Sequence, residues 1–132
     1  MLNQEKAIMY NDKVLEVFAN PKHIGIMKDA SAEGIVGNAS CGDIMKVFLK
    51  IENDVIVDAT FQTFGCTAAI ASTDTAMGMI IGKTLEEALA VTNADVVEQL
   101  EGLPPQKIHC SVMAEEAVRE AINNYKQEQK AE

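Results

Sequence analysis

Strict alternation of apolar and polar positions in the middle of the chain predicts two β-strands. Residues 43–52 and 55–63 each place an apolar residue at every second position, which is the period of a strand with one buried face. These apolar sets are Met45, Val47, Leu49 and Ile51, and then Val55, Val57, Ala59 and Phe61. Because Asn53 and Asp54 favour a turn between the segments, we expect the two strands to form a hairpin. A shorter candidate strand, Ile35–Ala39, precedes them.

Helical spacing of apolar residues marks three further segments. Glu5–Ala19 gathers its apolar residues roughly on one face and stops at Asn20-Pro21, since the residue before a proline disfavours helix. Thr67–Ile81 is rich in Ala, Met and Ile, and is expected to be a largely buried helix that ends at Gly82. Beyond Pro105, apolar residues recur at the spacing of a long amphipathic C-terminal helix. These residues are Met113, Ala117, Val118, Ala121, Ile122 and Tyr125.

Capping signals predict two short helices between the long ones. Thr84 and Glu87 fit a capping box, in which each side chain satisfies a backbone amide of the other residue. The helix that they begin is expected to run to about Val91, and Asn93 can cap another helix through Leu100.

The remaining pattern bounds the fold class. Gly102-Leu103-Pro104-Pro105 predicts a rigid extended break, and the polar tail, residues 126–132, is expected to fray. Strands come first and most helices later, which favours an α+β fold. A chain of 132 residues fits one domain, taken as residues 1–132 with a core at about 5–126.

The composition excludes several classes of function. With 20 acidic and 11 basic residues, the chain has a formal net charge of −9 and lacks the basic cluster that nucleic-acid binding needs. Such acidity suits partners with basic patches. No apolar run reaches the roughly 20 residues of a membrane helix, and the N-terminus has no signal-peptide pattern. The sequence therefore predicts a cytoplasmic protein with reduced thiols that binds neither nucleic acid nor membrane.

Three cysteines, Cys41, Cys66 and Cys110, lie at predicted boundaries between elements. Cys66 is expected at the start of the apolar helix and Cys110 near the start of the last helix, and helix N-termini favour the thiolate form. A single cysteine in such a place is most often a small buried hydrophobe. The recurrence at three boundaries, with Asp43 and His109 close by in sequence, favours a chemical role.

The ligand types are more informative than their spacing. The cysteines are separated by 25 and 44 residues, without the C-x-x-C pair of a zinc finger. Three thiolates with an imidazole or a carboxylate fit either zinc or an iron–sulfur cluster. A two-iron cluster needs four terminal protein ligands, and Asp43 or His109 could supply the fourth. A mixed ligand shell holds iron less firmly than four thiolates, which suits a site that releases its cargo.

Four motifs in order along the chain resemble the IscU/NifU N-terminal family of iron–sulfur cluster assembly scaffolds. The resemblance runs from about Tyr10 to Tyr125, and it implies a three-stranded antiparallel sheet with helices packed on it and a long C-terminal helix. It also implies that the three cysteines meet at one exposed end. The motifs are Asn20-Pro21-Lys22-His23-Ile24-Gly25, Ala39-Ser40-Cys41-Gly42-Asp43, Phe64-Gly65-Cys66-Thr67-Ala68-Ala69-Ile70-Ala71-Ser72 and Leu103-Pro104-Pro105-Gln106-Lys107-Ile108-His109-Cys110-Ser111.

The resemblance implies a function in assembly rather than catalytic turnover. In this family a cysteine desulfurase delivers persulfide sulfur to a scaffold cysteine, Fe²⁺ binds, and electrons reduce the sulfur. A [2Fe–2S] cluster forms, [4Fe–4S] clusters can follow on a homodimer, and the cluster passes to an apo-protein or a carrier. Zn²⁺ often occupies the same site.

By match to the family motifs, the resemblance also implies roles for single residues. Cys41, Cys66 and Cys110 are expected to bind the cluster, and Cys110 to accept the persulfide sulfur. Asp43 is the expected labile ligand or iron-entry carboxylate, and His109 the alternate ligand.

Further residues of the resemblance concern the surroundings of the site and the partners. Lys107 is expected to neutralise charge at the site, and Tyr10 matches an aromatic residue linked to dimer contact. The strip Leu103-Pro104-Pro105-Gln106-Lys107 matches the segment that binds a DnaK-type chaperone, and its prolines favour an extended recognition strip. The family usually has Val where Gln106 stands, and burying an unpartnered amide costs about 1–3 kcal/mol. Chaperone binding is therefore expected to be weaker here.

Two alternatives come from other classes of protein. One is a structural zinc module. The other is a cysteine enzyme in which Cys110 attacks a substrate; His109 is not expected to assist it, because neighbours in a helix do not face each other. Asp43 would have to act instead, and no oxyanion-hole motif is visible in the sequence.

Overall fold

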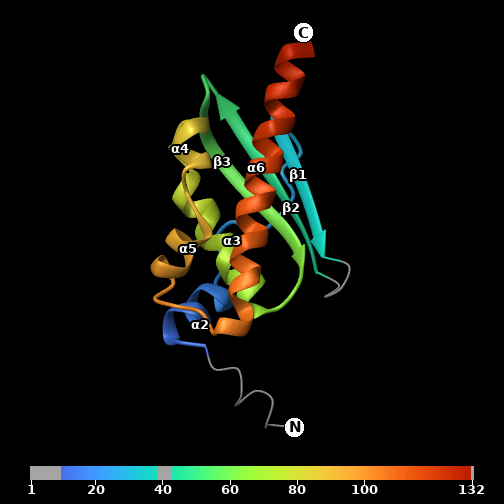
Figure 1. Ribbon diagram of the computed structural model, residues 1–132. Coiled ribbons are helices and arrows are strands. Elements are labelled where there is room, and N and C mark those ends of the chain that lie inside the picture. The colour runs from blue at the N-terminus through green and yellow to red at the C-terminus, as the bar shows by residue number, and fades with distance from the viewer. Residues whose placement is uncertain (1–9, 39–42, 132) are drawn as a thin grey trace.

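The computed structural model describes residues 10–38 and 43–131, without the side chains of Asn38, Asp43, Lys130 and Ala131. The elements are α2 (Asp12–Ala19), β1 (Ala32–Asn38), β2 (Asp43–Glu52), β3 (Val55–Phe64), α3 (Thr67–Ile80), α4 (Leu85–Leu89), α5 (Asn93–Gln99), the 3₁₀ helix η1 (Pro105–Lys107) and α6 (Ile108–Ala131) (Figure 1). The strands form one antiparallel sheet in the order β1-β2-β3. The predicted α+β fold, with three antiparallel strands and a long C-terminal helix, is confirmed.

The β2–β3 hairpin forms where the alternation predicts it, but the facing of its second strand is partly wrong. Asn53 and Asp54 take positive φ angles of 55° and 61° in the turn, a conformation that Asn and Asp tolerate well. The register shifts between Lys50 and Ile51. As a result Ile56 is fully buried and Val57 is exposed, the reverse of the predicted pattern.

The first strand is longer than predicted and contacts the last helix directly. β1 begins at Ala32, three residues before the predicted strand, while Ala39 at the predicted end lies outside the described residues. A Cβ atom at Gly34 would lie 2.5 Å from the carbonyl oxygen of Ala117 and from the amide nitrogen of Ala121, both in α6. The absence of a side chain at Gly34 therefore permits this close packing of β1 and α6.

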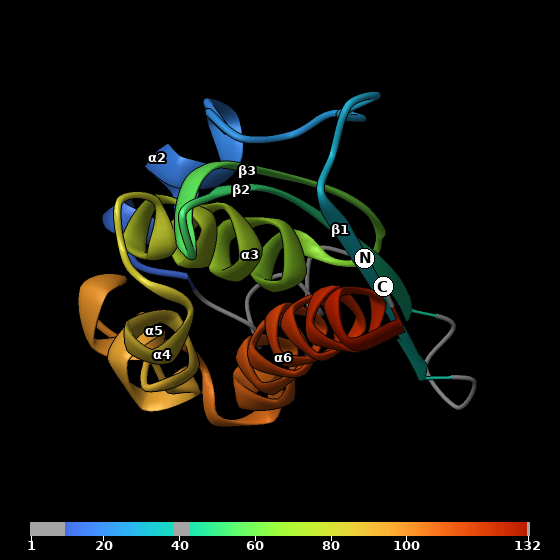
Figure 2. The same ribbon diagram turned by 90° about the horizontal axis from the view of Figure 1, so that it is seen from above.

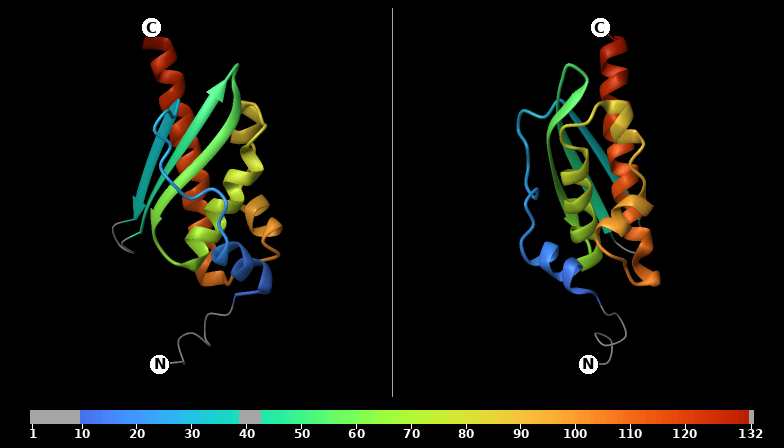
Figure 3. Two further views of the ribbon diagram at one scale, coloured as in Figure 1. Left: turned by 180° about the vertical axis from the view of Figure 1, so that it is seen from behind. Right: turned by 90° about the vertical axis from the view of Figure 1, so that its left-hand side faces the viewer.

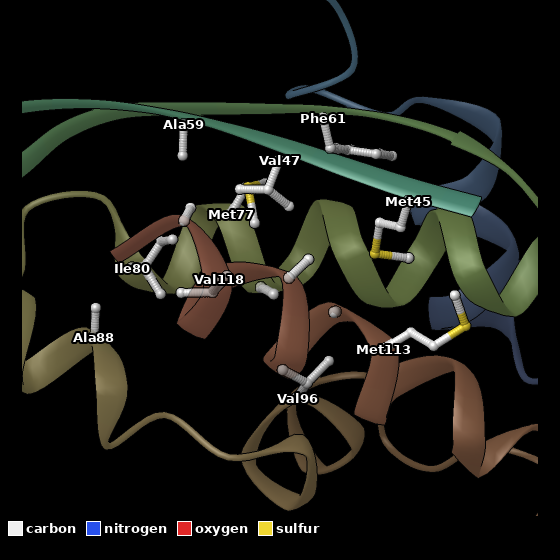
Figure 4. Close-up of a cluster of buried hydrophobic side chains, with 14 of the residues drawn as sticks. Met45, Val47, Ala59, Phe61, Met77, Ile80, Ala88, Val96, Met113 and Val118 are labelled. Atoms are coloured by element: carbon white, nitrogen blue, oxygen red, sulfur yellow. The ribbon is translucent and has the colours of Figure 1, made fainter. Parts of the chain in front are cut away.

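The helices cover one face of the sheet, and an irregular segment covers the other. Figure 2 shows α3, α4, α5 and α6 on one side of the strands, with the chain between α2 and β1 crossing the opposite side. Figure 4 shows buried side chains of the sheet reaching toward those of α3 and α6. The labelled ones are Met45, Val47, Ala59 and Phe61 from the sheet, Met77 and Ile80 from α3, and Met113 and Val118 from α6.

A buried carboxylate holds the irregular segment in place. Asp74 of α3 is 6% exposed, and its Oδ1 accepts hydrogen bonds from the amides of Lys22 and His23 at 2.8 and 2.7 Å. Phe61 of β3 then exchanges backbone hydrogen bonds with His23 and Gly25. The first of the four motifs is thus fixed to both α3 and β3.

Two helix starts differ from the prediction because a neighbouring residue makes the cap. α2 begins at Asp12, with Asn11 as its N-cap, so Tyr10 and Asn11 precede the helix rather than continuing one from Glu5. Residues 1–9 lie outside the described residues. Thr92, not Asn93, caps α5 through a capping box with Asp95. The capping box predicted at Thr84 is confirmed.

Two further segments are more helical than predicted. The polar tail continues α6 to Ala131, because no glycine or proline interrupts the sequence after Pro105. Pro105–Lys107 forms a 3₁₀ helix, so only the start of the predicted extended break is extended, as at Pro104 with ψ 140°. Among residues 10–38 and 43–131, no helix has the length and apolar character to cross a membrane.

Candidate functional site

Two of the three cysteines meet where α3 and α6 begin. Cys66 is the N-cap residue of α3, and Cys110 is in the first turn of α6. Their Sγ atoms lie 3.4 Å apart although the residues are 44 positions apart in sequence. Both helices pack against the same sheet face, and this brings their N-terminal ends together (Figure 3). The predicted convergence is confirmed for this pair.

The pair favours a thiolate on Cys66. The hydrogen bond with Cys110 is the largest of several effects that together lower the pKa of Cys66 to about 5, against the opposing effect of desolvation. The amides of Ala69 and Ala68, in the first turn of α3, and the positive charge of Lys107 contribute to the same lowering. Helix N-termini stabilise a thiolate in this way. At neutral pH Cys66 is therefore largely a thiolate.

The two sulfurs differ in exposure, so the expectation that the cysteines meet at an exposed end fits Cys66 but not Cys110. Cys66 is half-buried, whereas Cys110 is 0% exposed. Solvent therefore reaches the sulfur pair at Cys66 and not at Cys110. A reagent that is to meet Cys110 therefore needs the surrounding chain to move.

His109 lies against the neighbouring cysteine, so the prediction that it could not reach Cys110 is wrong. Its Nε2 is 3.7 Å from the Cys110 Sγ. His109 is exposed and sits in the first turn of α6, where no preceding turn of that helix restricts its ring. It is thus placed beside the sulfur pair, as the predicted role of alternate ligand requires.

The other predicted ligands cannot be placed. Cys41 lies outside the described residues, and only the backbone of Asp43, the first residue of β2, is described. Over the part of the chain that the structure describes, no group of three His, Cys, Asp or Glu side chains is arranged to hold a metal ion. The roles of Cys41 and Asp43 therefore stay predictions.

Tyr10 and Lys107 border the sulfur pair from two different segments. Burial raises the pKa of Tyr10, and the negative charge of the nearby Cys66 raises it further, while Lys107 opposes the shift. Tyr10 thus lies close enough for the charges of Cys66 and Lys107 to change its pKa. Lys107, at the end of η1, supplies positive charge next to the thiolate, as predicted.

Sequence reasoning missed Asn11, whose side chain joins the start of α2, next to Tyr10, to the chain that leads to Lys107. Its Oδ1 accepts a hydrogen bond from the amide of Val14, and its Nδ2 lies 3.0 Å from the carbonyl oxygen of Leu100, just before the Leu103–Lys107 strip. An asparagine directly before an amphipathic segment is a recognised N-cap signal. This N-cap signal was available in the sequence, whereas the hydrogen bond from Asn11 to the carbonyl of Leu100 was not.

An exposed apolar surface lies on the outer sheet face at the same end of the domain. Ile44 begins β2 and Phe64 ends β3, with exposed fractions of 50% and 77%. Together with Ile24 and Ile35, they line a shallow groove. Exposed apolar patches of this kind mark sites of protein interaction. Its position places it near Cys66, which follows Phe64 by two residues.

Comparison with known proteins matches the chain to one family. The family model for the NifU-like N terminal domain matches residues 9–132. The iron–sulfur cluster assembly scaffold protein IscU 1 of Archaeoglobus fulgidus is 50% identical over 117 residues, covering 89% of this chain and 76% of the relative. The nitrogen fixation protein NifU of Trichormus azollae is 49% identical over 125 residues, and the match covers 89% of this chain but only 42% of NifU.

A solved structure shows the same fold at lower sequence identity. The N-terminal part of a nitrogen-fixing NifU-like protein from Brucella abortus aligns with a TM-score of 0.70 at 20% identity, over 89% of this chain and 94% of that one. The sheet and the long last helix agree with this shared fold, and the sequence matches cover almost the whole chain. The chain belongs to the family of NifU-like N-terminal domains.

Proposed function

We propose that this protein is a scaffold on which iron–sulfur clusters are assembled and from which they are transferred to other proteins. The observation that carries the proposal is the Cys66–Cys110 sulfur pair, 3.4 Å apart and built from two helix starts. Membership of the NifU-like family supports it, since relatives about 50% identical to this chain are named cluster assembly scaffolds. We take residues 1–132 as a single scaffold domain and the cytoplasm as its location.

The ligands proposed for the cluster are the three cysteines and one weaker donor. Cys66 and Cys110 supply two adjacent sulfurs, and Cys41 is proposed as the third ligand. Asp43 or His109 completes the set of four that a [2Fe–2S] cluster needs. The contact between His109 and Cys110 supports the histidine, whereas Asp43 rests on its motif alone. The cluster is the cargo of this site, and Zn²⁺ suits the same donors.

Sulfur enters by persulfide exchange in the proposed reaction. The Cys110 thiol passes its proton to the adjacent Cys66 thiolate, and its sulfur attacks the terminal sulfur of a desulfurase persulfide. An S–S bond forms on Cys110, the S–S bond of the donor breaks, and the donor cysteine leaves as a thiolate. Two electrons from a protein donor then reduce the transferred sulfur to sulfide and regenerate the Cys110 thiolate. The low pKa of Cys66 supplies a second thiolate at neutral pH for Fe²⁺, since the thiolate is the form that binds metal.

The partners are proteins that must reach this end of the domain. We propose that the desulfurase and the recipient apo-proteins use the apolar surface of Ile24, Ile35, Ile44 and Phe64, which lies on the outer sheet face. A DnaK-type chaperone is proposed for the Leu103–Lys107 strip. Its affinity is expected to be low, because Gln106 replaces an apolar residue and Pro105–Lys107 must unwind from η1. A homodimer is the proposed state for [4Fe–4S] assembly.

Anaerobic reconstitution tests the proposal directly. The metal-free protein is incubated with Fe²⁺, cysteine and a cysteine desulfurase, and the visible spectrum is recorded before and after addition of an apo-ferredoxin. The proposal requires sulfide-to-iron absorption that forms on the wild type and then moves to the ferredoxin. The Cys66→Ser and Cys110→Ser variants should fail to form it.

The two histidines of the chain provide a matched control. His109→Ala removes the imidazole beside Cys110, whereas His23→Ala removes one that lies beside Gly78 of α3. We expect only the first variant to change the rate of assembly or the lifetime of the cluster. A stable zinc site without the chromophore would favour the structural module, and turnover of a small substrate would favour the cysteine enzyme. Either result would refute the scaffold.

A further inference from the structure

The two ends of the Asn11 side chain bind two different segments. Its Oδ1 accepts the hydrogen bond from the amide of Val14 at 2.8 Å, which caps α2. Its Nδ2 lies 3.0, 3.1 and 3.2 Å from the carbonyl oxygens of Leu100, Glu101 and Gly102. An amide NH₂ group has two hydrogens, which are shared among these three acceptors.

The turn held by Asn11, Leu100–Gly102, has an unfavourable backbone conformation that other contacts must stabilise. The last carbonyl groups of a helix lack partners within the helix. α5 ends with hydrogen bonds from Glu101 to the carbonyl of Glu98 and from Gly102 to that of Val97, the Schellman pattern. Glu101 takes the left-handed position of this pattern with φ 64°, where a residue with a side chain is disfavoured by roughly 1–2 kcal/mol. The Asn11 amide thus stabilises a strained turn.

Asn11 stands between the two borders of the sulfur pair. The residue before it, Tyr10, interacts with the backbone amide of Ala68 in the first turn of α3, the helix that Cys66 caps, and the charge of Cys66 raises the pKa of Tyr10. The turn after α5 leads directly through η1 to Lys107 and Cys110. Figure 1 and Figure 3 both show α2 against the chain that joins α5 to α6. The Asn11 amide therefore links the α2 border of the site to the segment that carries one of its sulfurs.

Access to Cys110 gives this link a function. Cys110 is 0% exposed, yet the scaffold proposed above requires sulfur and iron to reach its Sγ atom. The chain around it must therefore open and close again. The contacts of the Asn11 amide lie on the surface, from exposed to half-buried, and can break without disturbing the sheet and the core. Local openings of this kind need far less free energy than global unfolding.

We propose that Asn11 is a positioning residue that controls access to Cys110: its amide ties α2 to the Leu100–Gly102 turn, and Cys110 becomes accessible when this tie opens. The inference rests on the proposed function for its purpose but not for its test. Opening is measured in the metal-free protein, with no cluster assembly involved. If alkylation behaves as stated below and no cluster can be assembled, the scaffold proposal fails while the control of access stands.

Two substitutions remove the hydrogen bonds from the Asn11 amide to the Leu100–Gly102 turn but keep the N-cap of α2. Asn11→Ser keeps a side-chain oxygen for the Val14 amide, since serine caps helices about as well as asparagine, but has no NH₂ group. Asn11→Asp also caps well and is nearly the same shape, but it sets a carboxylate against three carbonyl oxygens. Asn124→Ser is the matched control, because the Asn124 Nδ2 donates a similar hydrogen bond to the carbonyl of Glu33 at 2.9 Å, away from the site.

The assay is alkylation of the native metal-free protein by iodoacetamide, followed for the Cys110 peptide by mass spectrometry at several low concentrations of urea. Loss of one hydrogen bond should raise the rate for Asn11→Ser by about tenfold, and Asn11→Asp should be at least as fast. Asn124→Ser should stay within about twofold of the wild type. The urea dependence should be much weaker than that of global unfolding, since little surface is exposed by a local opening.

The inference is overturned by either of two results. One is an unchanged rate at Cys110 in both Asn11 variants, with circular dichroism showing that both are folded. The other is an acceleration whose urea dependence equals that of global unfolding, or that Asn124→Ser reproduces, because Asn11 would then only stabilise the domain as a whole.

Discussion

The close backbone contact between Gly34 of β1 and α6 gives a sharp test of the packing. Gly34 faces Ala117 and Ala121 so closely that a Cβ atom would lie 2.5 Å from two backbone atoms and 3.0 Å from a third. Ordinary contacts of a Cβ atom begin at 3.4 Å. Gly34→Ala therefore forces β1 and α6 apart by about 0.9 Å, and backbone atoms on both sides cannot turn aside as a flexible side chain would.

The expected cost follows from the contacts that this separation weakens. A gap of 0.5–1 Å forfeits about a quarter to a half of each dispersion contact across an interface, and overpacking a core costs about 1–3 kcal/mol, occasionally more. Because the clash is with backbone, we expect about 3 kcal/mol of lost stability. For a chain of this length that corresponds to a fall in the melting temperature of about 10 °C.

Gly78→Ala is the matched control, with the opposite sign. Gly78 is exposed in α3, and an added Cβ would meet only the His23 Nε2 at an ordinary 3.4 Å. Alanine in an exposed helix is more stable than glycine by about 0.5–1 kcal/mol. Both variants are unfolded by heat and by urea with a chelator present, because bound metal would add stability. A loss below 1 kcal/mol for Gly34→Ala, or a loss of similar size for Gly78→Ala, would refute this account of the packing.

Three more predictions use the same protein. Ser72→Ala should raise the melting temperature, because the Ser72 hydroxyl is fully buried without a hydrogen-bond partner in the described structure and such a group costs about 1–3 kcal/mol; lower stability would contradict this. Alkylation of Cys66 in metal-free protein should stay near its maximum from pH 8 to pH 6 and fall only toward pH 5, because its depressed pKa of about 5 keeps the reactive thiolate populated; a fall beginning near pH 8 would show an ordinary thiol. Asp43→Ala should slow cluster transfer and lengthen cluster lifetime in the reconstitution assay, and loss of assembly without a longer-lived product would exclude the labile-ligand role.

Local sequence patterns predicted the helices and strands well wherever a single pattern, such as strict alternation or a capping box, was present. The β2 strand buries the apolar set that the alternation predicts, since its apolar and polar residues alternate with few exceptions. Phe48, predicted on the opposite and exposed face, is however buried as well. In β3, Val55, Ile56 and Val57 are all apolar, so the sequence permits either facing there. The register shift after Lys50 decides it in favour of Ile56. A register shift of one residue moves each side chain of a strand to the opposite face of the sheet. Such a shift depends on how the strand pairs with its neighbour, which cannot be inferred from the sequence of one strand.

The candidate site was predictable in its residue types but not in its geometry. Cys66 at a helix start follows from Gly65 and the apolar helix after it, and the helix start accounts for part of its lowered pKa. The largest cause, the hydrogen bond with Cys110, is a tertiary contact. The 3.4 Å between Cys66 and Cys110 depends on how α3 and α6 pack, across 44 residues of sequence. The burial of Cys110 and the contact of His109 with it are likewise tertiary effects, which is why the sequence favoured an exposed sulfur and an imidazole turned away.

The spacing of the sulfur pair is a property of the core rather than of a binding loop. α3 and α6 bury long apolar faces against one sheet, and their positions are set by contacts such as those of Gly34 with α6. Their N-termini are therefore held at a fixed separation, with Cys66 and Cys110 at their tips. The structure thus divides the site into two sulfurs fixed by packing and a border fastened by the Asn11 amide. A substitution that moves α6, such as Gly34→Ala, should consequently weaken the Cys110–Cys66 hydrogen bond and raise the pKa of Cys66, whereas Gly78→Ala should not.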